Sequence, residues 1–157
     1  MQKYHRTAMS RKNFSTPVQY LLKKDLINKD VDILDYGCGR GYDVEHLNDD
    51  NYNVIGYDPN GKYADANIAR TFQIVMCNFV LNVIQDADER LAVENDLIDH
   101  LIEGGVAYIS VRNDSCVANG CTSTGTWQGL VEPVNEGWEL IVSNSKFKMW
   151  KYYKVTR

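Results

Sequence analysis

Three glycines at alternate positions form the clearest chemical motif of the chain. Gly37, Gly39 and Gly41 follow the short apolar run DILDY, residues 32–36, and a helical pattern begins at about Gly41. A loop without side chains lets backbone N–H groups approach a ligand, and the start of a helix favours a negative group there. The motif therefore predicts a binding site for a carboxylate or a phosphate.

A single acid on the next predicted strand completes this pattern. Asp58 follows the run NVIGY, residues 53–57, and lies 21 residues after Gly37. An acid at that place accepts hydrogen bonds from the hydroxyl groups of a ribose. The loop and the acid together predict a nucleoside-containing cofactor; the alternative is a tight turn with an incidental aspartate.

The spacing of the glycines separates two cofactor classes. In the dinucleotide fingerprint G-x-G-x-x-G, the third glycine allows close packing of the helix. Here Tyr42 occupies the sixth position, and the third glycine, Gly41, comes one residue early. The pattern therefore makes NAD the weaker choice.

The elements that must position these residues alternate along the first two thirds of the chain. Short apolar runs bounded by turn residues predict buried strands, and apolar residues at helical spacing predict helices. Such alternation builds a parallel sheet with helices on its faces. The predicted strands span residues 32–36, 53–57, 72–77 and 106–111.

Two helices carry start signals in the sequence. Thr16 is the expected N-cap of the first, with Pro17 at the first helical position, and the apolar stripe reaches Leu26 over about three turns. Asp86 begins the second, which is expected to run through Ile102 and to end at the glycine pair that follows.

The last third of the chain changes character. Residues 138–142 and 147–155 are typical of a β-hairpin, which adds antiparallel strands to the sheet. The glycine-rich stretch 113–137 is long for a loop, and residues 125–134 are the expected place of a further strand. The predicted fold is α/β, a three-layer sandwich with a mostly parallel sheet and a C-terminal antiparallel hairpin.

Length and composition fit one domain. The chain has 157 residues, 44% apolar and 24% charged, enough for a buried core. Without a bilayer-length apolar run or a secretory signal, we expect a cytoplasmic protein with no membrane partner. Four scattered cysteines and three histidines lack zinc-site spacing, so we expect reduced thiols and no metal.

The expected single domain has three parts: an N-terminal arm and helix (1–30), a cofactor-binding core (31–112), and a C-terminal loop and hairpin (113–157).

A set of motifs resembles a known family. DILDYGCGRG, GYDPNG, VMCNFVLNVI and GGVAYISVR, in this order, resemble the motif series of class I S-adenosylmethionine-dependent methyltransferases, which have a Rossmann-like sheet. More narrowly, HRTAMSR, DYGCGRG, GYDP, VLNVI and GTWQ resemble motifs of methyltransferases of phages and of DNA phosphorothioation loci. The resemblance covers roughly residues 3–130, and the motifs are specific only as a set.

The resemblance implies S-adenosyl-L-methionine as the cofactor and assigns roles to particular residues. Asp35 would bind the ammonium group, the glycine-loop amides the carboxylate, and Asp58 the ribose. Cys77 and Asn78 would border the sulfonium and the incoming nucleophile, with Asn78 as the catalytic candidate. The implied cofactor-binding set is Asp35, Gly37, Cys38, Gly39, Gly41, Asp58, Pro59, Cys77 and Asn78.

The sequence also departs from the family pattern. Only 13 residues separate Asp58 from Phe72, too few for the helix, strand and helix that usually intervene, so the element that walls the adenine is expected to be shortened or missing. Asp65 or Asn67 would take its place. No Asp-Pro-Pro-Tyr motif follows the Cys77 strand, which removes the usual sign of exocyclic amine methylation in DNA.

The charges are segregated along the chain. Residues 1–24 carry +6 and residues 146–157 carry +5, whereas the middle carries −15. Basic ends attract phosphates even when the total charge is negative, so nucleic acid is a possible partner; the alternative is two solvated faces. The candidate substrate contacts are His5, Arg6, Arg11, Arg112 and Trp127.

Each of these candidates has a structural alternative. The N-terminal arm is either a lid over the substrate or an unfolded tail. Arg112 either neutralises an anionic substrate or pairs with Asp114, and Trp127 either stacks on a base or belongs to the core.

The predicted function is methyl transfer to nucleic acid or another anionic substrate; the alternative is an accessory or sequestering protein that binds S-adenosylmethionine without catalysis. The sequence predicts no oligomeric state.

Overall fold

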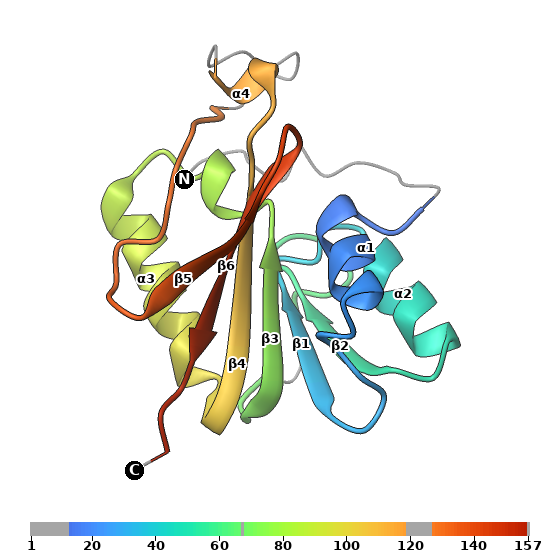
Figure 1. Ribbon diagram of the computed structural model, residues 1–157. Coiled ribbons are helices and arrows are strands. Elements are labelled where there is room, and N and C mark those ends of the chain that lie inside the picture. The colour runs from blue at the N-terminus through green and yellow to red at the C-terminus, as the bar shows by residue number, and fades with distance from the viewer. Residues whose placement is uncertain (1–12, 67, 119–126, 157) are drawn as a thin grey trace.

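A computed structural model describes residues 13–66, 68–118 and 127–156. Six strands form one sheet in the order β2-β1-β3-β4-β6-β5 (Figure 1). The strands are β1 (Asp32–Tyr36), β2 (Asn53–Tyr57), β3 (Phe72–Asn78), β4 (Leu101–Arg112), β5 (Trp138–Ser143) and β6 (Phe147–Tyr153). The helices are α1 (Thr16–Lys23), α2 (Tyr42–Asp49), α3 (Ala87–Asp99) and α4 (Ser115–Ala118), with the short 3₁₀ helix η2 (Leu81–Val83) after β3.

The sheet is parallel on one side and antiparallel on the other. β1 pairs in parallel with β2 and β3, and β3 pairs in parallel with β4. β6 then runs antiparallel to both β4 and β5, so the C-terminal hairpin extends the parallel sheet. The predicted fold class is confirmed, and β1 and β2 have the predicted bounds.

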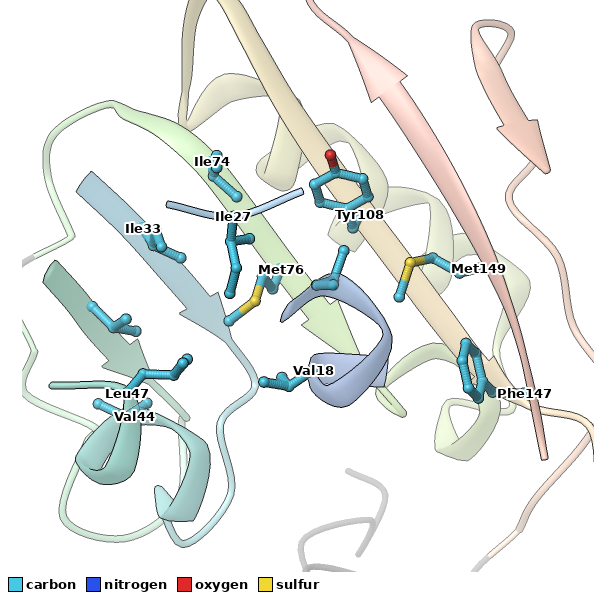
Figure 2. Packing of buried hydrophobic residues seen from close by; sticks show 12 residues of the cluster. Val18, Ile27, Ile33, Val44, Leu47, Ile74, Met76, Tyr108, Phe147 and Met149 are labelled. Atoms are coloured by element: carbon cyan, nitrogen blue, oxygen red, sulfur yellow. The ribbon is translucent and has the colours of Figure 1, made fainter. Parts of the chain in front are cut away.

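Helices cover both faces of this sheet, so the fold has three layers. In Figure 1, α1 and α2 lie on one side of the strands and α3 on the other. Figure 2 shows Val18 of α1 and Leu47 of α2 on the face that carries Ile33 and Met76. All four side chains are fully buried. Burial of this apolar surface is the main stabilising contribution to the packing of α1 and α2.

The first helix begins one residue earlier than predicted and is shorter. Ser15, not Thr16, is the N-cap, and its side chain accepts a hydrogen bond from the N–H of Val18. The helix ends at Lys23. Asp25 then adopts a φ of 53° and turns the chain, so Leu26 reaches the core from outside the helix.

The predicted end of α3 is wrong. The expected helix through Ile102 stops at Asp99, and Leu101 already begins β4. The N–H of Phe72 donates to the carbonyl of His100 at 2.7 Å, and Leu101 is the register partner of Phe72. Pairing with β3 therefore overrides the helical spacing of apolar residues. Asp86 is the N-cap of α3, as predicted.

The connection between β2 and β3 is short, as predicted. Its described residues form turns and contain no helix or strand, so β2 is an edge strand. The side chain of Asn48 covers that edge: its amide nitrogen donates to the carbonyl of Val54 at 2.9 Å, and its oxygen accepts the N–H of Val54 at 2.8 Å. Satisfied edge groups of this kind discourage pairing with another chain.

The expected further strand at residues 125–134 is not found where the structure describes that segment, from Trp127 onward. A side chain of α3 anchors this stretch instead. The buried carboxylate of Glu94 accepts the N–H groups of Val134, at 3.0 Å and 3.1 Å, and of Asn135, at 3.0 Å. Backbone groups that a strand would pair are thus satisfied by an acid on a helix.

None of the helices in the described ranges has the length and apolar character needed to cross a bilayer. Within the same residues, no group of three or more His, Cys, Asp or Glu side chains is arranged to hold a metal ion.

Candidate cofactor site and active site

The carboxyl ends of the parallel strands bring the predicted site residues to one edge of the sheet. The register places Asp35 of β1 beside Gly56 of β2 and Met76 of β3. Asp58 follows the end of β2, and Asn78 is the last residue of β3. Ligands of open α/β sheets bind outside these strand ends, so residues far apart in sequence meet where chemistry is expected.

The glycine loop between β1 and α2 needs glycine for two reasons. Gly37, Gly39 and Gly41 have φ values of 82°, 60° and 83°, a region that other residues rarely adopt. A Cβ on Gly37 would lie 2.4 Å from Val80, and one on Gly41 would lie 2.2 Å from the ring of Tyr63. The loop is therefore a tightly packed turn as well as a surface for a ligand.

Most N–H groups of the loop donate within the protein. Gly37 and Cys38 donate to the carbonyl of Tyr57 at 2.7 Å and 3.0 Å, and Gly41 donates to the carbonyl of Cys38 at 3.0 Å. The N–H of Gly39 donates to the carboxylate of Asp58. These internal bonds hold the loop in one shape. Because the glycines have no side chains, a ligand can still come close to the loop backbone.

Asp58 links the loop to the end of β2. Its Oδ2 accepts the N–H of Gly39 at 2.9 Å, and its Oδ1 accepts the N–H of Asn60 at 2.9 Å. The residue is half-buried, whereas the next residue, Pro59, is exposed. A carboxylate oxygen accepts more than one hydrogen bond, so Asp58 keeps capacity for a hydroxyl group of a ligand.

Two thiols lie near the buried carboxyl group of Asp35. Burial first, and then the charges of Asp35 and Asp58, raise the pKa of the half-buried Cys38 thiol. Burial first, and then Asp35, raise the pKa of Cys77, which has no exposed surface. Both thiols are therefore protonated near neutral pH, and Cys77 packs in the core beneath the site.

Asn78 carries the most distinctive polar group at this edge. Its Oδ1 accepts a hydrogen bond of 2.8 Å from the Oγ of Ser110 on β4. Its Nδ2 is buried and has no hydrogen-bond partner among the residues that the structure describes. The next residue, Phe79, has a φ of 61°, a strained conformation for a bulky side chain.

The start of α1 is fastened to the start of α2, next to the loop. Asp43 accepts the N–H of Ser15 at 2.9 Å and the hydroxyl of Ser15 at 2.8 Å. The ring of Phe14 packs edge-on against Tyr42 and His46, with centroids 6.3 Å and 6.4 Å away. Phe14 and Ser15 therefore lie against the first turn of α2, the helix that follows the glycine loop.

Of the five substrate candidates, the structure describes Arg112 and Trp127. Arg112 donates two hydrogen bonds of 2.9 Å to Asp114, so it forms the ion pair named as its alternative. Trp127 is half-buried, with the guanidinium of Arg90 5.9 Å from a ring centroid. His5, Arg6 and Arg11 lie outside the described residues, as does Asn67; Asp65 is exposed after β2.

Asn82 ties η2 to the segment after residue 126. Its Nδ2 donates to the Oε1 of Gln128 at 2.9 Å, and its carbonyl accepts the N–H of Gly129 at 2.9 Å. Both side chains are buried. This pair is structural, and it holds Trp127 near the carboxyl edge of the sheet.

Sequence analysis missed several residues that shape the site. Ser110 orients Asn78, Tyr63 packs on the glycine loop, and Asp43 holds the start of α1. Ser110 had a usable signal, because it is a lone small polar residue in the apolar run AYISV. Tyr63 and Asp43 had none, since their partners are distant in sequence.

The residues at this edge fit a nucleoside cofactor with an amino-acid end. Asp35 and Asp58 offer carboxylates for an ammonium group and for hydroxyl groups, and the loop offers close approach. Asn78 offers a donor that has no partner in the described part of the chain. A mixed sheet of this order, with Asp35 near the end of β1 and a glycine loop after the strand, matches the Rossmann-like class I methyltransferases, whose methyl donor is S-adenosylmethionine.

The chain belongs to the methyltransferase domain family. The family model matches residues 3–155, almost the whole chain. This membership decides between the two cofactor classes that the glycine spacing left open: the cofactor is S-adenosylmethionine, and the protein is a methyltransferase.

Solved methyltransferases share the fold at low sequence identity. A 1,6-didemethyltoxoflavin N1-methyltransferase from Burkholderia thailandensis is 14% identical, with a TM-score of 0.62 over 90% of this chain and 78% of its own. The N-methyltransferase NodS from Bradyrhizobium japonicum WM9 is 12% identical, with a TM-score of 0.57 over 98% and 97%. A TehB-like methyltransferase from Corynebacterium glutamicum is 18% identical, with a TM-score of 0.57 over 86% and 85%. No curated protein matches the sequence.

Proposed function

We propose that the chain transfers a methyl group from S-adenosylmethionine to an anionic acceptor, nucleic acid above all, at the carboxyl edge of β1–β4. One observation carries the site assignment. The N–H of Gly39 and the carboxylate of Asp58 join the glycine loop to the acid after β2, so both halves of the expected cofactor site form one unit.

The proposed cofactor contacts follow the edge of the sheet. Asp35 holds the ammonium group, the loop from Gly37 to Gly41, which includes Cys38 and Gly39, lies against the methionine end, and Asp58 with Pro59 holds the ribose. Cys77 supports the floor beneath the sulfonium by packing, because its buried thiol is protonated. When bound, S-adenosylmethionine supplies a methyl group that passes to a lone pair of the acceptor while sulfur keeps the bonding electrons.

Asn78 is the proposed catalytic residue. A carboxamide does not take up a proton, so Asn78 can only hydrogen-bond and orient the acceptor. Alignment of the reacting atoms accounts for much of the rate of such a displacement. The acceptor therefore reacts through a lone pair that is available at neutral pH, and its surplus proton leaves to water.

The basic ends support an anionic acceptor, although the side chain of Lys154 acts within the fold. Lys154 donates to the carbonyls of Ile98 and Leu101, both at 3.0 Å, and so caps α3. The exposed Lys146, by contrast, lies in the hairpin turn, where its carbonyl accepts the N–H of Asn113 just after β4. We propose that Lys146 acts with His5, Arg6 and Arg11 on phosphates and that Trp127 stacks on a base.

The narrower resemblance to phage and phosphorothioation-locus methyltransferases supports the same acceptor. The cytoplasm is the proposed compartment, where free thiols such as Cys38, Cys77 and Cys116 stay reduced.

The test is transfer of tritium from methyl-labelled S-adenosylmethionine to separate pools of DNA, RNA and small metabolites. We expect label on a nucleic-acid pool, followed by a new methylated nucleoside identified by mass. Label on the metabolite pool alone would reject the nucleic-acid acceptor and retain the methyltransferase.

The second candidate is an accessory protein that binds the cofactor without using it. The missing Asp-Pro-Pro-Tyr motif after the Cys77 strand favours this alternative, because that motif is the usual sign of amine methylation in DNA. It predicts binding of S-adenosylhomocysteine in calorimetry together with no label in any pool.

A further inference from the structure

Ser110 holds the end of β3 from the neighbouring strand. Asn78 and Ser110 are register partners in the β3–β4 pair. The Oγ of Ser110 donates to the Oδ1 of Asn78 at 2.8 Å, and the carbonyl of Ser110 accepts the N–H of Phe79 at 2.9 Å. Ser110 has no exposed surface, so water does not compete for its hydroxyl group.

The residue that Ser110 holds by its carbonyl is strained. Phe79 has a φ of 61°, and a bulky residue adopts this region only where the surroundings impose it. Strain of this kind is concentrated at functional sites. The turn at Phe79 is where the chain leaves the sheet, so the same serine fixes both the backbone after Asn78 and its side chain.

The orientation of the carboxamide decides what Asn78 offers to a ligand. With Oδ1 turned to Ser110, the remaining polar atom is Nδ2, which is buried and unpartnered among the described residues. A buried donor without a partner costs free energy, and a ligand atom that accepts a hydrogen bond there removes that cost.

We infer that Ser110 is a positioning residue: its hydroxyl keeps Asn78 turned so that Nδ2 donates to an atom of the acceptor molecule beside the atom that is methylated. The inference rests on the proposed function and names the chemistry of its acceptor. A donor matches an atom with a lone pair, such as a ring nitrogen or carbonyl oxygen of a nucleobase, and it does not match a protonated amine, which carries only donors. Within the proposed nucleic-acid substrate, the edge of a neutral base carries such atoms, and it is the acceptor group that this inference names.

Four variants of the full chain separate the parts of this inference. Ser110→Ala removes the donor to Oδ1, and Ser110→Cys nearly keeps the volume with a weaker donor. Asn78→Asp keeps an oxygen for Ser110 but removes Nδ2. Ser143→Ala, at an exposed serine of β5, is the matched control.

The first measurement needs no ligand. In ¹⁵N-labelled protein, Asn78→Asp identifies the Nδ2 signals by their disappearance. We expect the order parameter of these N–H bonds to fall in Ser110→Ala from about 0.85 to below about 0.6, the rigid and flexible ranges, and to be intermediate in Ser110→Cys. An unchanged order parameter in a folded Ser110→Ala protein would overturn the inference, and Ser110→Cys decides if the alanine variant does not fold.

The second measurement is methyl transfer to the nucleic-acid pool at saturating cofactor. Loss of one oriented hydrogen bond predicts a rate about tenfold lower in Ser110→Ala, at least as low in Asn78→Asp, and unchanged in Ser143→Ala. A full rate in Asn78→Asp would overturn the role of Nδ2. If the natural protein labels no nucleic acid, the proposed acceptor fails, while the order parameter still decides whether Ser110 positions Asn78.

Discussion

The carboxylate of Asp58 accepts the backbone N–H of Gly39 at 2.9 Å, so the acid after β2 also holds the middle of the loop after β1. These two residues are 19 positions apart and belong to separate turns. Asp58 therefore stabilises the conformation of the loop, and it is also the candidate residue for binding the ribose. Substitutions at Asp58 therefore act on binding and on loop shape together.

Asp58→Ala should weaken the binding of S-adenosylhomocysteine. It removes the acceptor proposed for the ribose and the bond that shapes the loop, and charge-assisted hydrogen bonds predict a loss of about 1 to 3 kcal/mol. Isothermal calorimetry measures this, with Asp65→Ala, an exposed acid of the same connection, as the control. Equal affinity in Asp58→Ala would remove Asp58 from the site.

Gly41→Ala should destabilise the protein more than Gly61→Ala. Both glycines have positive φ values, 83° and 91°, so each substitution is expected to cost about 1 to 2 kcal/mol in backbone strain. Only at Gly41 would the new Cβ meet a ring, that of Tyr63, whereas nothing lies within 4 Å at Gly61. Overpacking adds about 1 to 3 kcal/mol.

Urea unfolding of the two variants gives this difference directly. Measured against Tyr63→Ala alone, Gly41→Ala should cost no more than the backbone strain seen at Gly61, because the ring that meets the new Cβ is gone. Equal losses at Gly41 and Gly61 would show that the Tyr63 ring moves aside at no cost.

Cys77→Ala should retain methyl transfer. Burial, and then the charge of Asp35, raise the pKa of this thiol, so a thiolate nucleophile is not available near neutral pH. Loss of one buried sulfur should cost about 1 kcal/mol of stability. The measurement is the initial rate of tritium transfer beside the unfolding midpoint. A folded variant that still binds S-adenosylhomocysteine but transfers nothing would give the thiol a chemical role.

The ion pair of Arg112 and Asp114 should contribute to stability in a pH-dependent way. Burial by itself would raise the pKa of Asp114, but hydrogen bonds from Arg112 and from the Val117 N–H outweigh it and hold the pKa below the ordinary 3.8. Because the folded pKa is the lower one, the stabilisation is complete above 3.8 and disappears as the pH falls through the folded value.

The difference in unfolding free energy between the natural protein and Asp114→Asn should therefore shrink as the pH is lowered from about 6 to about 2. Asp49→Asn, at an exposed acid of α2, corrects for the loss of one negative charge. A difference that stays constant over this range would show that the pair does not depend on the charge of Asp114.

Elements whose signals are local were predictable from the sequence. The strands Asp32–Tyr36 and Asn53–Tyr57 agree with their predicted bounds, and Asp86 caps α3 as expected. A cap or a short apolar run acts through neighbouring residues, so its signal is complete in the local sequence. The absence of further elements between Asp58 and Phe72 was also predictable, because the number of residues between them is read directly from the sequence.

Elements that depend on distant partners were not predictable. The apolar residues after Asp99 fit a helix, but Leu101 pairs with Phe72 in the sheet. Residues 127–134 have the composition expected of a strand, yet Glu94 and Asn82 bind their backbone. In both cases a contact across the fold outweighs the local preference.

Strand polarity and chain length alone predict that a glycine loop after the first strand and an acid after the second lie at one edge of a parallel sheet. No local pattern predicts that Val80 and Tyr63 fill the space over Gly37 and Gly41, or that Ser110 turns the carboxamide of Asn78. These contacts join side chains from separate elements, and their geometry exists only once the sheet register and the packing of the turns are set.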